Sequence, residues 1–313
     1  MIRKIGLIGL IGLIGLISPI RKVEAVGVSL GISPPLLEVM IQPGKSVIQA
    51  YEIINNSNTD LYLRARIAPF EPANNQGEVK LTTNRHLPRT NNLFSLANAN
   101  INLNQTFKLS ANSQQQLVLK ISPSQDILES DYYYTLLIEQ SPEGEFFNRN
   151  GAQNIIKIGT NLLITVSTGG KTKIAAAVSK FSSQRPIIDW LEPVKFEIEI
   201  KNKGQTYFKT RGKIEISHQW YPKIKQQLAL RPDNVLANSK RKAICLNSNS
   251  AQLCQTHSIW PGPYQAKLTI NNDNGQEIVQ SSTSFIILPI SLVLPLFLVI
   301  SFILILSRRR RIT

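Results

Sequence analysis

Residues 61–67 read Leu-Tyr-Leu-Arg-Ala-Arg-Ile, so apolar side chains alternate with tyrosine and arginine. Because successive side chains of a β-strand point to opposite faces of its sheet, this pattern predicts one face against a core and one toward solvent. The same alternation returns at 117–121, 162–166 and 194–200. No stretch between residues 26 and 284 sustains a helical period, and we therefore predict an all-β fold for this part of the chain.

Polar turn clusters separate the predicted strands, for example Asn55-Asn56-Ser57-Asn58 and Asn202-Lys203-Gly204. Short alternating strands between such clusters are typical of antiparallel sandwiches. A faint repeat indicates two copies of one plan, because 47–67 and 194–216 both read as strand, Asn-rich turn and strand.

A strand that carries tyrosine closes each of the two copies. In immunoglobulin-like sandwiches, a Tyr near the start of a late strand packs at a corner and hydrogen-bonds back to the backbone. Tyr132 and Tyr264 are the candidates for this role. We therefore predict two tandem immunoglobulin-like β-sandwiches, over 26–168 and 169–284, with the boundary among the small residues 167–170.

The N-terminus has the layout of a signal peptide. Arg3 and Lys4 precede an uncharged run over 5–17, which at about 13 residues is too short to span a membrane. Small residues around Ala25 suit a signal peptidase, so we predict a signal peptide over 1–25 that is cleaved after Ala25. The alternative is a signal anchor that is retained.

The C-terminus reads as a membrane anchor. Residues 285–306 contain no charged side chain and are long enough for a transmembrane helix. Four arginines follow, Arg308, Arg309, Arg310 and Arg311. By the positive-inside rule they place a basic tail, 307–313, in the cytoplasm, which predicts a single-pass type I protein of the cell membrane with its ectodomain outside. A sortase signal is the alternative, but residues 288–292 read Leu-Pro-Ile-Ser-Leu and lack its Thr and Gly.

The net charge of +15 is unevenly distributed. Residues 26–168 hold 10 basic and 11 acidic side chains, whereas 169–284 hold 17 basic and 8 acidic ones. A basic exported domain favours anionic lipid or anionic cell-wall polymer as a partner and argues against nucleic acid. The alternative is a solvated lysine-rich surface without a partner.

Two cysteines, Cys245 and Cys254, are the only ones in the chain. In an oxidising exterior, such a close pair predicts a disulfide that closes a small loop. His257 lies nearby and could join a metal site, but the chain has three histidines and no further ligand cluster there. We predict no metal and no cofactor.

Motifs that carry catalysis are missing from the sequence. There is no Gly-rich phosphate loop, no His-Glu-x-x-His and no Cys-x-x-Cys. We therefore predict that the chain is not an enzyme and assign no catalytic residue. Trp220 continues the alternation of Ile214, Ile216 and His218, which predicts a core position. Trp260 precedes Pro261 and is expected at a loop edge, where it is the candidate ligand contact.

Several stretches together resemble the bacterial WxL-interacting proteins, which have a peptidoglycan-binding domain and a second membrane-proximal domain. These stretches are 33–39 (Ser-Pro-Pro-Leu-Leu-Glu-Val), 43–46 (Pro-Gly-Lys-Ser), 55–57, 131–133, 156–166, 202–204 and 234–241. The resemblance implies a non-catalytic, membrane-anchored protein of the cell envelope and cell surface whose ectodomain binds cell-wall polymer or a surface protein. The alternative is a structural stalk or accessory for surface-protein display or assembly, with protein contacts only.

Overall fold

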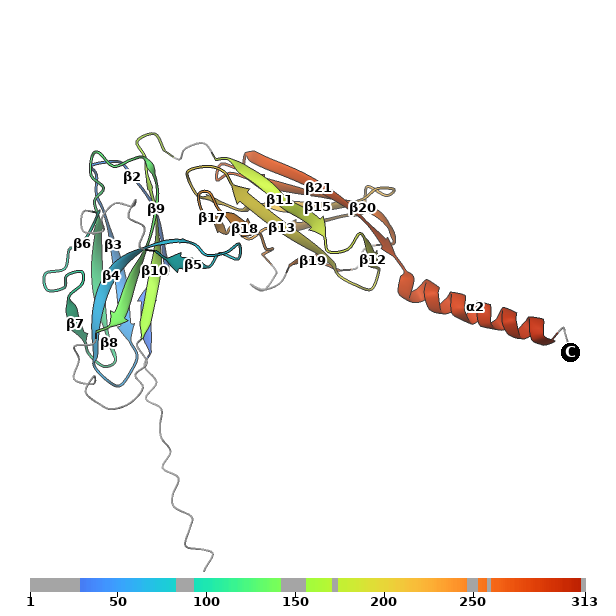
Figure 1. The fold of residues 1–313 in the computed structure, drawn as a ribbon, viewed down its shortest axis with the longest axis horizontal. Coiled ribbons are helices and arrows are strands. Elements are labelled where there is room, and N and C mark those ends of the chain that lie inside the picture. Colours follow the sequence, from blue (N-terminus) through green and yellow to red (C-terminus); the bar gives the residue numbers. More distant parts are fainter. Residues whose placement is uncertain are drawn as a thin grey trace, which may run out of the picture.

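The structure is a computed structural model that describes residues 29–82, 93–141, 156–170, 174–246, 253–257 and 260–310. These residues form strands β1 to β21 and one helix, α2 (Ile290–Arg310), so the predicted all-β class is confirmed (Figure 1). The predicted signal peptide and its cleavage site at Ala25 lie outside the described residues.

Strands β1 to β10 form two sheets that enclose one core, and we call this group the first sandwich. Its strands are β1 (Leu30–Ser33), β2 (Leu36–Ile41), β3 (Val47–Asn55), β4 (Leu61–Pro72), β5 (Val79–Leu81), β6 (Phe94–Leu96), β7 (Thr106–Leu109), β8 (Ser113–Ile121), β9 (Ser130–Gln140) and β10 (Lys157–Val166). One sheet has the order β1-β3-β8-β6 and the other the order β2-β10-β9-β4-β5, with β7 also paired to β4.

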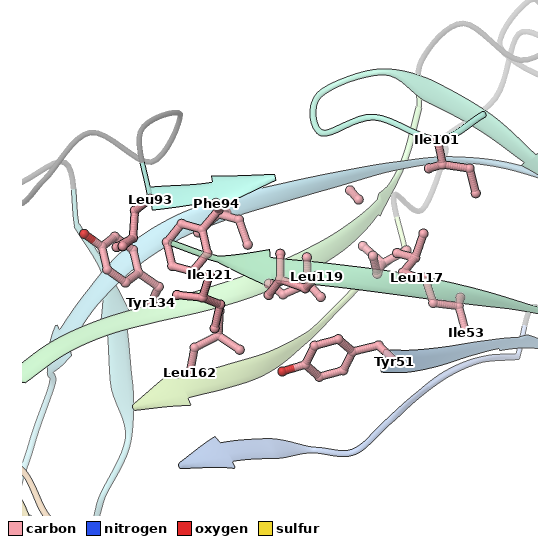
Figure 2. Close-up of a cluster of buried hydrophobic side chains, with 14 of the residues drawn as sticks. Tyr51, Ile53, Leu93, Phe94, Ile101, Leu117, Leu119, Ile121, Tyr134 and Leu162 are labelled. Carbon is pink, nitrogen blue, oxygen red and sulfur yellow. The ribbon is translucent and has the colours of Figure 1, made fainter. Parts of the chain in front are cut away.

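Side chains from both sheets meet in the core of the first sandwich (Figure 2). Tyr51 and Leu119 from one sheet, and Tyr134 from the other, are completely buried. The alternation that predicted the fold is confirmed, because Leu63 is completely buried while the Arg64 side chain is 35% exposed. Each large apolar side chain buried in this way contributes about 1.5–3 kcal/mol to stability.

Strands β11 to β21 enclose a separate core and form the second sandwich. They are β11 (Ala176–Ser183), β12 (Ile187–Asp189), β13 (Val194–Asn202), β14 (Phe208–Lys209), β15 (Arg211–His218), β16 (Lys225–Ala229), β17 (Asn234–Val235), β18 (Lys240–Lys242), β19 (Cys254–Thr256), β20 (Gly262–Asn271) and β21 (Glu277–Leu288). One sheet has the order β11-β13-β18 with β19 on β13, the other the order β12-β21-β20-β15-β16, and β14 pairs with β17.

A strand that changes sheets closes one side of each sandwich. In the first sandwich β1 pairs antiparallel with the last four residues of β3, and β2 then pairs in parallel with β10. The two pieces are joined through a cis Ser33-Pro34 peptide bond. In the second sandwich β11 and β12 do the same, on β13 and β21.

Both predicted corner tyrosines are confirmed. The Tyr132 hydroxyl donates to the Leu128 carbonyl at 2.7 Å, and the Tyr264 hydroxyl donates to the Trp260 carbonyl at 2.8 Å. Each bond spans four residues and anchors the start of a buried strand. Burial raises the pKa of Tyr264 to about 12.

A buried asparagine ends the equivalent strands β3 and β13. The Asn55 side chain donates to the Thr59 carbonyl at 2.9 Å and accepts the Ser57 N–H at 3.0 Å. Asn202 donates to the Thr206 carbonyl at 2.8 Å and accepts the Gly204 N–H at 2.8 Å. Such side-chain bonds hold a turn in place of backbone pairing, so the predicted repeat has a physical counterpart at these two turns.

The end of the chain differs from the prediction. Residues 285–288 were assigned to a helix, yet they are the last residues of β21, and Phe285 and Ile287 pack in the second core. The helix begins only at Ile290, where the Asp189 carboxylate accepts the Ser291 N–H at 2.7 Å. The apolar run therefore joins a half-buried strand end to a helix.

Among the described residues, no helix combines the length and the hydropathy of a membrane span. The predicted transmembrane helix over 285–306, the cell-membrane localisation and the contact with membrane lipid are therefore wrong. Arg308, Arg309 and Arg310 form the end of α2, while their side chains and the whole of Arg311 lie outside the described part of the chain.

Candidate functional site

The two sandwiches touch through a small apolar contact. Phe70 and Leu163 of the first sandwich pack with Tyr207 and Leu236 of the second, and all four side chains are buried. Tyr133 lies against this cluster and stacks on Phe70 with 5.8 Å between ring centroids. Burial raises the pKa of Tyr133 far above its ordinary value, and the Asp131 carboxylate adds to this shift.

Hydrogen bonds around buried Asp131 strengthen this contact. The carboxylate accepts the Tyr133 hydroxyl at 2.8 Å and the Tyr207 N–H at 2.5 Å, so it bonds residues of both sandwiches. The Tyr133 hydroxyl in turn accepts the Ala237 N–H at 2.9 Å. On the edge strand β2, Glu38 pairs with Lys209 at 2.6 Å across the same junction.

The turn between β4 and β5 makes a second connection (Figure 1). Asn75 donates to Glu199 of the second sandwich at 2.9 Å, and its carbonyl accepts the Lys242 N–H at 2.6 Å. Gly77 has a positive φ of 94°, and a Cβ at this residue would lie 2.3 Å from the Arg241 guanidinium carbon. The junction is thus held at two separated places.

Strand β10 is paired on both sides along only part of its length. It pairs with β9 over the whole of Lys157–Val166, but β2 covers its other side only from Asn161 onward. We call Lys157–Thr160 the free half of β10. No described strand pairs with the outer side of this half.

In the free half, the backbone N–H and C=O groups of alternate residues point away from β9. The Ile156 carbonyl accepts the Gln140 N–H of β9 at 3.0 Å. Since successive residues of a strand direct their backbone groups to alternate sides, those of Lys157 and Gly159 point away from β9. Gly159 leaves room for a side chain of β9, because a Cβ there would lie 2.8 Å from the Thr135 methyl carbon.

Three cations surround one carboxylate beside the free half. Glu139 of β9 is flanked by Lys157 of β10 and by Arg64 of β4, each with an N–O distance of 3.1 Å, and Arg66 lies at 3.3 Å. We call these four side chains the basic cluster. Burial alone would raise the pKa of Glu139, but hydrogen bonds from Lys157 and Arg66 bring it below its ordinary value.

The Glu139 carboxylate therefore stays ionised at neutral pH. Its side chain is 9% exposed, whereas those of the three cations are 35–44% exposed. The basic cluster carries a net charge of +2 on the outer face of the sheet, with Lys157 in the free half of β10 and the two arginines on β4.

Exposed aromatic side chains gather where β15 ends and β20 begins. Trp220 lies two residues beyond the end of β15 and is 71% exposed, so its predicted core position is wrong. His218 is buried instead, and its Nδ1 accepts the N–H groups of Trp220 at 3.1 Å and Tyr221 at 3.2 Å. Trp260 is 72% exposed at its loop edge, and its role as a ligand contact stays a prediction.

Cys245 and Cys254 lie beside each other in the second sandwich, joined by a disulfide with 5.0 Å between their Cα atoms. Both residues belong to the second core. In the described part of the chain, no group of three or more His, Cys, Asp or Glu side chains is placed to hold a metal ion.

No protein-family model and no curated protein matches this chain. Among solved structures, a chaperone–tip adhesin complex of CFA/I fimbriae biogenesis matches at 10% identity with a TM-score of 0.41, covering 82% of this chain and 98% of that one. The class 5 fimbriae chaperone CfaA matches at 11% identity with a TM-score of 0.40, covering 83% and 100%. The E. coli chaperone DraB matches at 10% identity with a TM-score of 0.36, covering 82% and 98%. At these identities and TM-scores, the similarity lies in the fold and assigns no function to this chain.

These findings correct two predictions. The resemblance to WxL-interacting proteins is wrong, because no family model matches this chain and the similar structures reported above are of fimbrial chaperones. The membrane-anchored, peptidoglycan-binding envelope protein, with its alternative of a display stalk, is not retained. Cell-wall polymer is not retained as a partner.

Proposed function

We propose that this chain is a non-catalytic protein-binding module that holds an extended segment of a partner protein along the free half of β10. The observation that carries the proposal is the uneven pairing of β10, with β9 on one side throughout and β2 on the other only from Asn161. An unpaired sheet edge is a template for another strand, whose backbone supplies the hydrogen bonds.

Two other partly open strands suit this role less well. On β3, residues 47–51 extend beyond β1, but the Ala50 carbonyl already accepts the Gln49 side-chain amide at 2.7 Å. On β21, residues 277–285 extend beyond β12, but β11 packs against β21. β1 also contacts β10, and the Pro34 carbonyl accepts the Thr160 hydroxyl, but the contact is less extensive than that of β11 with β21, and no described strand pairs with the outer side of Lys157–Thr160.

Lys157 does not protect the edge against strand addition. A lysine on an edge strand often prevents pairing with other chains. Here its ammonium group is held at 3.1 Å from Glu139, on the outer face of the sheet. Three of the similar solved structures contain a chaperone together with a tip subunit or a pilin. Strand addition to this chain is proposed from the edge of its own sheet.

A proline substitution tests the proposal. In Lys157→Pro the outward N–H is lost and a ring occupies the edge, while the bonds to β9 stay because they do not use that N–H. Lys157→Ala is the matched control, since it changes the same side chain and keeps the N–H.

The readout is photo-crosslinking in the native cells, with a photoreactive residue at Ser33. Ser33 is exposed and precedes Pro34, whose carbonyl accepts the Thr160 hydroxyl of the free half at 2.8 Å. We expect protein adducts with the parent chain and with Lys157→Ala, and their loss with Lys157→Pro at an unchanged unfolding midpoint. Adducts that persist in the folded proline variant would falsify strand addition at β10.

A further inference from the structure

The basic cluster borders the free half of β10, and this position restricts the chemistry of what can bind there. Lys157 belongs to both, since its backbone groups point out of the edge and its side chain contacts Glu139. A ligand strand on this edge would therefore meet the cluster as well as the backbone.

The geometry of a sheet fixes which ligand side chain would approach the cluster. Directly opposite residues on neighbouring strands place their side chains on the same face, with Cβ atoms about 4.5–5.5 Å apart. A residue added opposite Lys157 would thus project beside the Lys157 ammonium group. Its neighbours along the added strand would point to the other face.

The charges at this place are not balanced. Three cations share the single carboxylate of Glu139, and the Arg64 Nε is buried without a hydrogen-bond partner in the described structure. Glu139 already interacts with all three cations and cannot neutralise them alone. An added lysine or arginine would be repelled, whereas an added carboxylate would find two uncompensated positive charges.

We propose that the segment that pairs with β10 carries an acidic side chain opposite Lys157, which pairs with the Lys157 ammonium group and is attracted at longer range by the positive charge of Arg64 and Arg66. This inference rests on the strand-addition function proposed above and specifies its partner as an acidic extended peptide. The cluster then selects among possible strands, while the backbone supplies sequence-independent pairing.

Three labelled peptides distinguish strand addition at β10 from the preference for an acidic side chain. Each repeats Ser-Val-X-Val three times, with X as Glu, Gln or Lys, so that X and Ser face the cluster while Val faces the other way. Binding to the full chain is measured by fluorescence polarisation at low and at high salt. We expect the Glu peptide to bind about tenfold more tightly than the Gln peptide, with the Lys peptide weakest.

Charge-removing variants locate the effect. We expect Arg66→Gln and Lys157→Gln each to reduce binding of the Glu peptide about threefold and to leave the Gln peptide unchanged. Lys225→Gln, on the edge strand β16 of the second sandwich, is the matched control and should change neither. High salt should reduce the difference between the Glu and Gln peptides.

The outcomes are distinct. Equal binding of the Glu and Gln peptides, both lost in Lys157→Pro, would overturn the acidic specificity and leave strand addition intact. Preference for the Glu peptide that survives both charge-removing variants would also overturn it. Failure of all three peptides to bind would overturn strand addition itself.

Discussion

Asn55 in the first sandwich and Asn202 in the second end equivalent strands, and each side chain bonds the N–H two residues ahead and the carbonyl four residues ahead. Tyr132 and Tyr264 also match in position and in their bond to a carbonyl four residues earlier. The edges of the two sandwiches differ. The free half of β10 supplies Lys157 to the basic cluster, whereas the corresponding stretch of β21 is a run of Gln, Ser and Thr.

The two sandwiches thus agree at their buried turns and corners and differ at their edges. Buried polar side chains at turns and corners must satisfy backbone groups that water cannot reach, so both sandwiches keep the same solution. The backbone groups of an edge strand can bond to water instead, so the side chains around an edge are free to differ between the two sandwiches. If this distinction holds, substitutions at the asparagine turns and the tyrosine corners should have equal effects in the two sandwiches. Changes at the disulfide or at Glu139 should affect only the sandwich that contains them.

Loss of the buried asparagines should have the largest effect. Asn55→Ala and Asn202→Ala each leave several buried donors and acceptors without partners, and we expect each to lower the free energy of unfolding by about 3 kcal/mol. Urea unfolding measures this, with exposed Asn56→Ala as a near-neutral control. A large effect in one sandwich and none in the other would show that the two turns are not equivalent.

The disulfide distinguishes the sandwiches, because it lies only in the second. Its reduction should cost about 2–3 kcal/mol by freeing the unfolded loop. Hydrogen exchange with and without reductant should show increased opening of β19 and its neighbour β13 and no change in β9. A mass measurement of the unreduced chain should find it two hydrogens lighter than the reduced one, and equal masses would contradict the bond.

Removal of the corner hydroxyls should have a smaller and equal effect. Tyr132→Phe and Tyr264→Phe each lose one hydrogen bond, which is expected to cost about 1 kcal/mol. Tyr51→Phe is the matched control, because its hydroxyl is buried with no partner in the described structure and its removal should be neutral or stabilising. A cost at Tyr51 equal to that at the corners would refute the assigned role of these bonds.

The smallest expected effect is the pH dependence that comes from Glu139. Its pKa is lowered in the folded chain, so its stabilising contribution is present above the unfolded pKa of about 4.3. This contribution is lost as pH falls through the folded value. Glu139→Gln should flatten the stability profile below about pH 4.3, while Glu52→Gln, exposed on β3, should not. Parallel profiles for the parent and Glu139→Gln would contradict the contribution of the cluster.

The sequence predicted features that repeat along the chain at short range. Alternation over 61–67 led to β4, and the positions of Tyr132 and Tyr264 led to their corners. Two errors came from extending a pattern across an element boundary. The alternation placed Trp220 in the core although β15 ends at His218. Hydropathy joined Phe285 to the helix although it belongs to β21, which ends at Leu288.

The candidate site could not be predicted in this way. Its free half exists because β2 begins to cover β10 only at Asn161, and an unpaired backbone has no side-chain signature. The basic cluster brings together residues from β4, β9 and β10, with Arg64 and Glu139 separated by 75 positions. Each of these charges, taken alone, reads as an ordinary outward residue of an alternating strand.

The change of sheet between β1 and β2 has a consequence for how the first sandwich could vary between relatives. Residues 30–41 first pair with part of β3, as β1, and then with part of β10, as β2. The position of Pro34 therefore sets both uncovered lengths, and when the uncovered part of β3 becomes shorter, that of β10 becomes longer. Moving the crossover two residues later would lengthen the cover on β3 and uncover more of β10. An insertion or deletion of a single residue there would instead reverse the facing of every side chain in β2. Binding length could therefore be adjusted in steps of two residues at one place, without altering either core.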